Sequence, residues 1–144
     1  MKLVERHIIR SNHRFYPEID RLCWLSKNLY NSANYLIRQS FIFEGIYLPY
    51  NDIQKAVQSG ECDRGLNAKV CQQILINLDR SWRSFLEAKR AVQEQPEKFK
   101  GRLKLPKYKK KESGRNLLVY TVQAIGKRQL KQGIIHPSKT STAL

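Results

Sequence analysis

Two long stretches with apolar residues at helical spacing constrain the fold of this chain more than any other feature. The first begins at Pro17 and ends at Gly45, and the second covers residues 68–92. In both, apolar residues recur three or four positions apart, which gives a helix one buried face. We expect a short helix between them that ends at Gln58, followed by a polar loop at residues 61–67. Three such helices can form a small bundle.

Several residues in these stretches have expected roles in capping and packing. Asn51 or Asp52 is expected to cap the short helix, and Asn67 the second long one, because their side chains accept hydrogen bonds from the first turn. Trp82 and Phe85 lie on the apolar face, so we expect them in the core and not in a base-stacking platform. The residues expected on the two apolar faces are Ile19, Leu22, Cys23, Leu29, Tyr30, Ala33, Leu36, Ile37, Phe41, Val70, Cys71, Ile74, Leu75, Leu78, Trp82, Phe85 and Leu86.

Shorter stretches at both ends favour β-structure. Residues 2–10 and 117–122 are rich in Val, Ile and other residues that favour strands, and residues 134–135 offer a short apolar strand. Residues 124–132 fit one or two helical turns that Gly133 closes. The fold class expected from the sequence is therefore α+β, with helices between strand-forming ends.

Positive charge is concentrated in the last third of the chain. The sequence has 27 Lys and Arg against 12 Asp and Glu, a formal net charge of +15, and residues 96–144 hold 13 of the basic residues but 2 of the acidic ones. Such a field attracts polyanions and releases counterions when phosphates bind. Nucleic acid is therefore the expected partner. We expect no membrane partner, because no apolar run is long enough to span a bilayer and no amphipathic helix accompanies the cations.

Residues 98–111 form the densest basic run, with eight Lys and Arg positions. Pro and Gly exclude a continuous helix there. If residues 98–104 are extended, alternate cations project from one edge and follow a phosphate backbone, while Phe99 and Tyr108 suit stacking on unpaired bases. Lysine acts as a point charge, so this segment predicts affinity with little sequence readout. The candidate nucleic-acid-binding residues are Lys98, Lys100, Arg102, Lys104, Lys107, Tyr108, Lys109, Lys110, Lys111, Arg115, Tyr120, Lys127, Arg128 and Lys131.

Catalytic and metal-binding patterns are not found in this sequence. The acidic residues are scattered, whereas metal-dependent phosphodiester chemistry needs carboxylates that converge. The three histidines have no ligand spacing to a second His or Cys, and Cys23, Cys62 and Cys71 form no C-x-x-C pair. We expect no catalytic residue, metal or cofactor. Two cysteines on apolar helix faces fit buried thiols in a reducing cytosol.

Three segments resemble the TnpB/OrfB-type transposon proteins, which are RNA-guided DNA endonucleases related to the type V CRISPR effectors. The first is Leu-Tyr-Asn-Ser-Ala-Asn at 29–34. The second, at 72–85, is a helix that begins Gln-Gln and contains Leu-Asp-Arg-Ser-Trp. The third is Leu-Pro-Lys-Tyr-Lys-Lys-Lys at 105–111, followed by the Tyr-Thr stretch at 119–123. The order and spacing of these segments match the family over nearly the whole chain.

The resemblance implies a fold and a function. It implies a helical recognition domain at residues 15–96, which is often described as a helix-turn-helix DNA-binding domain. This domain is inserted into a β-barrel-like wedge domain at residues 1–14 and 97–144, incomplete at its C-terminus. In the family these parts bind guide RNA and the guide–target duplex, and a downstream domain supplies the nuclease carboxylates and zinc cysteines.

The expectation is therefore an N-terminal, nucleic-acid-binding part of a TnpB-like transposase that has no nuclease domain and acts in the bacterial cytosol. It would be the product of a decayed transposable-element gene or a fragment of a longer protein. Two alternatives stay open. One is half of a split nuclease, completed by a downstream fragment. The other is a stand-alone helix-turn-helix regulator, which would prefer a defined DNA duplex.

Overall fold

The computed structural model describes residues 3–58 and 65–144, and it is mainly helical. The first helices are α1 (Tyr16–Gln39), which continues into a π-helical turn (Ser40–Glu44), and α2 (Tyr50–Val57). They are followed by α4 (Ala68–Glu94), two 3-10 turns (Pro96–Lys98 and Val122–Ala124) and α5 (Lys127–Leu130). Of the loop expected at 61–67, residues 61–64 lie outside the described residues.

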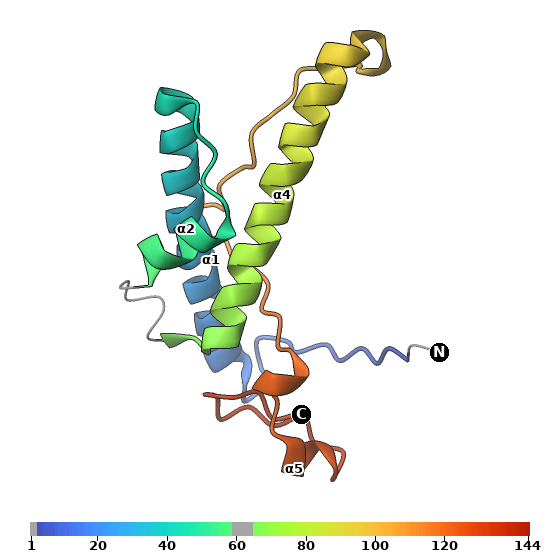
Figure 1. The fold of residues 1–144 in the computed structure, drawn as a ribbon. Helices are drawn as coiled ribbons and strands as arrows, with labels where there is room; N and C mark the ends of the chain where they lie inside the picture. The colour runs from blue at the N-terminus through green and yellow to red at the C-terminus, as the bar shows by residue number, and fades with distance from the viewer. Residues whose placement is uncertain (1–2, 59–64) are drawn as a thin grey trace.

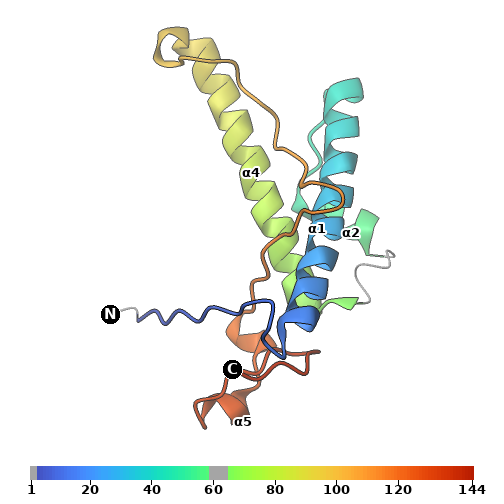
Figure 2. The same ribbon diagram turned by 180° about the vertical axis from the view of Figure 1, so that it is seen from behind.

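The two long helices set the shape of the molecule. α1 and α4 lie together near one end and diverge towards the other, and α2 packs across both (Figure 1). The chain between α4 and the C-terminal segment runs back past α1, and it is seen in front of α1 in the reverse view (Figure 2). Residues 3–10 extend away from the bundle (Figure 1).

The ends of α1 follow from local sequence. Pro17 lies in the first turn, where its fixed φ suits a helix and its missing N–H is not needed. After the π-helical turn, Gly45 adopts a left-handed conformation with φ of 69°, and its N–H bonds the carbonyl of Ser40. Glycine adopts this conformation without the strain that a side chain would bring. The predicted extent of the first long helix, from Pro17 to Gly45, is confirmed.

Capping was predicted correctly for one of the two later helices. The side chain of Asn67 accepts a hydrogen bond of 2.9 Å from the N–H of Lys69, as expected for the cap of α4. The cap of α2 was predicted wrongly, because the helix begins two or three residues earlier than expected. Pro49 occupies the N-cap position and makes no side-chain capping bond. Asp79 of α4 accepts from the N–H of Tyr50 instead, at 3.1 Å, so a neighbouring helix satisfies a donor at the start of α2.

The core lies where α1, α2 and α4 meet, and most residues of the expected apolar faces form it, whereas Cys23 is only half-buried and is not part of it. Its fully buried members include Ala33, Leu78 and Trp82. Trp82 packs edge-to-face with Phe41, whose ring centroid is 5.4 Å away, and with Phe85, 5.9 Å away. Such pairs add stability beyond the apolar area they bury. The prediction that Trp82 and Phe85 are core residues is confirmed.

The α+β prediction with a β-barrel-like wedge is wrong. In the described residues no strand forms, and the only bridge is an isolated antiparallel one between Ile125 and Pro137. Residues 3–8 are exposed and have no strand partner. Residues 117–122 pack against the helical core through Leu118 and Tyr120. The backbone groups at 116–117 bond to α1, so the contacts that a sheet would have supplied are made to a helix.

The C-terminal segment folds back on the start of α1. α5 is followed by Gly133 in a left-handed conformation, as the sequence indicated. The expected strand at 134–135 is reduced to a pair of backbone hydrogen bonds between Ile135 and Leu144. Glu18 of α1 accepts hydrogen bonds from the N–H and hydroxyl of Ser141 and from the hydroxyl of Thr142, at 2.7–2.9 Å. The C-terminal segment is therefore anchored to the first helix.

Candidate nucleic-acid interface

We call the basic segment at residues 98–115 the strap. From residue 106 to residue 115 it runs antiparallel to α1 and is held by polar side chains of that helix. Asn31 makes two bonds of 2.9 Å with the backbone of Lys109, one to its carbonyl and one from its N–H. The Nζ atom of Lys27 donates to the carbonyl of Lys111 at 2.5 Å. The other bonds run from Tyr30 to Lys107, from Asn34 and Arg38 to Pro106, and between Arg115 and Asp20.

The strap and helix match in length. From Lys27 to Arg38, α1 rises about 16 Å at ~1.5 Å per residue. From Lys111 back to Pro106, an extended chain covers about the same distance at ~3.3 Å per residue. This match lets successive turns of α1 bond to alternate residues of the strap. Because the bonds go to backbone atoms, the lysine side chains remain available for other contacts.

A buried asparagine joins the strap to the core. Asn34 is fully buried; its amide nitrogen donates to the carbonyl of Pro106 at 3.1 Å, and its oxygen accepts from the indole N–H of Trp82 at 2.9 Å. One side chain therefore connects α1, α4 and the strap. These three residues come from the three sequence segments of the family resemblance.

The end of the strap turns sharply and is fixed by an ion pair. The N–H of Gly114 bonds the carbonyl of Lys110, and a Cβ at position 114 would lie 2.3 Å from that oxygen. Only glycine fits this turn without a backbone shift. Arg115 then makes two bonds of 2.8 and 2.9 Å to the carboxylate of Asp20, and this guanidinium holds the pKa of Asp20 below its usual value despite some desolvation.

The structure brings most of the candidate residues to the surface. All eight basic residues of 98–111 are exposed, and within the described part of the chain none takes part in an ion pair. Lys127, Arg128 and Lys131 are exposed on and after α5, away from the anchored part of the strap. Arg115 is paired with Asp20. Tyr120 is half-buried against the core, and burial raises the pKa of its hydroxyl.

The single row of cations expected at residues 98–104 is interrupted. Lys98 ends a 3-10 turn, and the chain bends at Lys100 and Gly101. The extended part that α1 supports is residues 106–111. The regular spacing of cations is therefore found in the second half of the basic run.

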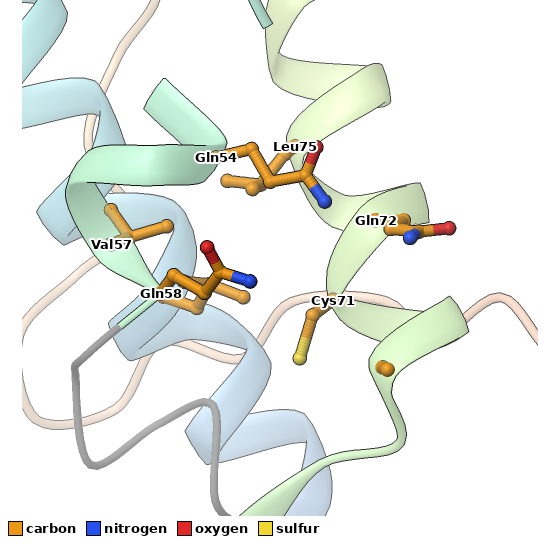
Figure 3. A pocket seen from close by; sticks show the side chains of 8 residues that line it. Gln54, Val57, Gln58, Cys71, Gln72 and Leu75 are labelled. Atoms are coloured by element: carbon orange, nitrogen blue, oxygen red, sulfur yellow. The ribbon is translucent and has the colours of Figure 1, made fainter. Parts of the chain in front are cut away.

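Two cavities in the described part of the chain differ in their linings. One of about 120 Å³ lies between α2 and α4, with Gln54, Gln58, Gln72 and the Cys71 sulfur around it (Figure 3). Another of about 190 Å³ is mainly apolar and is lined by Ile19, Leu22, Leu118, Tyr120, Pro137, Thr140, Thr142 and Leu144. Among the described residues, no group of three or more His, Cys, Asp or Glu side chains is placed to bind a metal ion. No described helix is long and apolar enough to cross a membrane.

Sequence reasoning missed the residues that hold the strap. It assigned Tyr30 to an apolar face, and it did not assign Lys27 and Asn31 any contact with the basic run. Lys27 is 2 % exposed, a rare position for a lysine. A signal was present, since polar residues recur at positions 20, 27, 31, 34 and 38 of α1. That spacing indicates a second face of the helix in contact with polar groups.

A scan against protein-family models finds no match, and neither the curated proteins nor the solved structures contain a significant one.

Proposed function

We propose that this protein binds nucleic acid through the strap, by contacts between its lysine side chains and the phosphate backbone. The observation that carries the proposal is that the backbone and the side chains of one segment have different surroundings. The backbone of residues 106–111 is bonded to α1, while every lysine in that stretch is exposed. A preformed row of cations binds a polyanion with less loss of conformational entropy than a mobile tail.

The distribution of charge supports the same proposal. Most of the net positive charge lies in residues 96–144, and within the described residues the eight cations at 98–111 form no ion pair with a carboxylate, whereas Arg115 is paired with Asp20. Such a surface releases counterions when it meets phosphate, which gives affinity without base recognition. A role in a TnpB-like transposition system is part of the proposal. It is supported by the contacts among Asn34, Trp82 and Pro106, each from a different motif segment. A cytoplasmic location follows from this role.

A salt titration of binding tests the proposal. The association constant for a labelled RNA or DNA is measured by fluorescence anisotropy at several salt concentrations. Each phosphate neutralised contributes about −0.7 to −0.9 to the slope of log K against log salt. Replacing Lys107, Lys109 and Lys111 by Gln should therefore make the slope less steep by about 2–3 and weaken binding at low salt.

The matched control removes the same charge elsewhere. Lys55, Lys69 and Arg80 are exposed on α2 and α4, and Gln at these positions changes the net charge equally. The control should keep most of the slope, because only the long-range field is weakened. A wild-type slope near zero, or equal slopes for the two triple variants, would contradict binding through the strap.

A further inference from the structure

We infer that the strap surface binds single-stranded nucleic acid, with unpaired bases stacked on aromatic side chains that flank the lysine row. The inference rests on the proposed function and adds the class of ligand. The aromatic residues are Trp24 and Tyr35 of α1 and Tyr108 of the strap, with exposed fractions of 41 %, 53 % and 44 %.

Trp24 is linked to the strap through one side chain. The Nζ atom of Lys27 lies 5.0 Å from the centroid of the Trp24 ring and donates to the carbonyl of Lys111. The indole therefore lies beside the end of the extended segment. Lys27 contacts the ring at a cation–π distance, and the exposed part of the indole is available for another contact.

Tyr35 occupies the same side of α1 as Trp24, eleven positions later. Eleven residues make about three helical turns, so the two positions lie on nearly the same side of α1, about 16 Å apart along the helix axis. Asn31, one turn before Tyr35, holds the backbone of Lys109. Tyr35 therefore lies beside the strap at a second point along its length.

Tyr108 contributes a ring from the strap itself, between two lysines. The guanidinium carbon of Arg38 lies 5.0 Å from the centroid of its ring. An arginine paired with an aromatic ring in this way offers two planar groups that bases can stack on. Three partly exposed rings and the lysine row are thus combined along one helix.

This combination favours unpaired bases over a duplex. Within a duplex the faces of the bases are covered by neighbouring bases, so aromatic side chains on a protein surface cannot stack on them. A single strand exposes its base faces while its phosphates follow a positively charged surface, and the stacking tolerates any sequence. None of the three rings belongs to the buried core, in contrast to Trp82, which is 0 % exposed.

The two tryptophans make the inference testable by intrinsic fluorescence. Trp24 is partly exposed and Trp82 is buried, and the chain has no other tryptophan. Oligothymidylate should quench the emission of Trp24, whereas heparin, a polyanion without bases, and a duplex of equal length should leave it nearly unchanged. Trp24→Ala should abolish this quenching and weaken oligothymidylate binding about fivefold or more, with duplex binding little affected.

Two further variants control for folding and for aromatic surface in general. Trp24→Phe keeps a ring and should keep most of the affinity for oligothymidylate. Phe43→Ala removes an aromatic residue that is 77 % exposed in the π-helical turn and should not change binding. In the two Trp24 variants the emission comes from buried Trp82 alone and reports whether the protein is folded, and circular dichroism serves the same purpose for Phe43→Ala.

The outcomes separate the inference from the proposed function. Equal quenching by heparin or duplex, or unchanged oligothymidylate affinity in Trp24→Ala, overturns the single-strand inference and leaves strap binding standing if the salt slope persists. Absence of binding to any nucleic acid overturns both. Selective quenching together with the loss in Trp24→Ala supports both.

Discussion

Asn34 is the residue on which the attachment of the strap to the core depends most. It donates to the Pro106 carbonyl and accepts from the Trp82 indole, and both Asn34 and Trp82 are inaccessible to solvent. A buried polar group that keeps its partners costs little, but one that loses them costs its full desolvation energy. The amide of Asn34 carries both a donor and an acceptor, so it pairs with the Pro106 carbonyl and with the Trp82 N–H at the same time.

Replacement of Asn34 by Ala should lower the free energy of unfolding by about 1–3 kcal/mol, since the Trp82 N–H is left buried without an acceptor. Urea denaturation followed by circular dichroism measures this change. Ser32→Ala, on an exposed face of the same helix, is the matched control and should change stability by less than about 0.5 kcal/mol.

A double-mutant cycle with Trp82→Phe tests the cause of that loss. If the unpaired indole is responsible, Asn34→Ala should cost less in the Trp82→Phe background, where no indole N–H remains. Additive effects of the two substitutions would mean that the hydrogen bond of 2.9 Å contributes little to stability.

At the scale of elements, α1 makes structural contacts on two different faces. One face packs against α2 and α4, and the other bonds to the strap at residues such as Asn31 and Asp20. The strap's own sequence, rich in Lys and broken by Gly and Pro, does not favour regular structure. Its extended form follows from the helix beside it, and the turn at Gly114 fixes where it ends.

Asn31→Ala should weaken nucleic-acid binding without changing its salt slope. The substitution removes both bonds to the Lys109 backbone but no charge, so a binding ligand has to order that part of the strap. Fixing the backbone of one residue costs about 1–2 kcal/mol, which predicts a loss of roughly five- to thirtyfold in affinity. Anisotropy titrations at several salt concentrations give both quantities, with Ser32→Ala as control. A flatter slope, or unchanged affinity, would show that Asn31 does not position the lysines.

The helices could be predicted from the sequence because their signals are local and repeated. The apolar spacing gave both long helices, and Gly45 and Asn67 marked two of their ends. The strand predicted at residues 117–122 does not form. Strand propensity reflects a half-buried extended chain, and a helix surface provides that environment as well as a sheet does. The strap lysines were predicted as candidate binding residues, but the α1 residues that hold the strap depend on non-local contacts, which spacing alone did not reveal.

At the scale of the whole molecule, two carboxylates of the first turns of α1 hold the last third of the chain. Glu18 bonds the C-terminal segment at Ser141 and Thr142, and Asp20 bonds Arg115 at the end of the strap. Burial alone would raise the pKa of Glu18, but the hydrogen bonds from Ser141 and Thr142 outweigh it and leave that pKa lowered. The Arg115 guanidinium lowers the pKa of Asp20 in the same direction.

Acid should therefore loosen the C-terminal third from α1. A carboxyl whose pKa is lower in the folded state stabilises that state above its unfolded pKa, here 4.5 for Glu18 and 3.8 for Asp20, and loses this contribution as pH falls through the folded value. The Glu18→Gln, Asp20→Asn double variant lacks both charges. Wild type should melt about 2–4 °C above it near neutral pH, and the gap should close as pH drops below about 4. A difference in melting temperature that does not change with pH would contradict an electrostatic origin. Self-repulsion of this basic chain in acid lowers the stability of both proteins alike, so it does not account for a change in that difference.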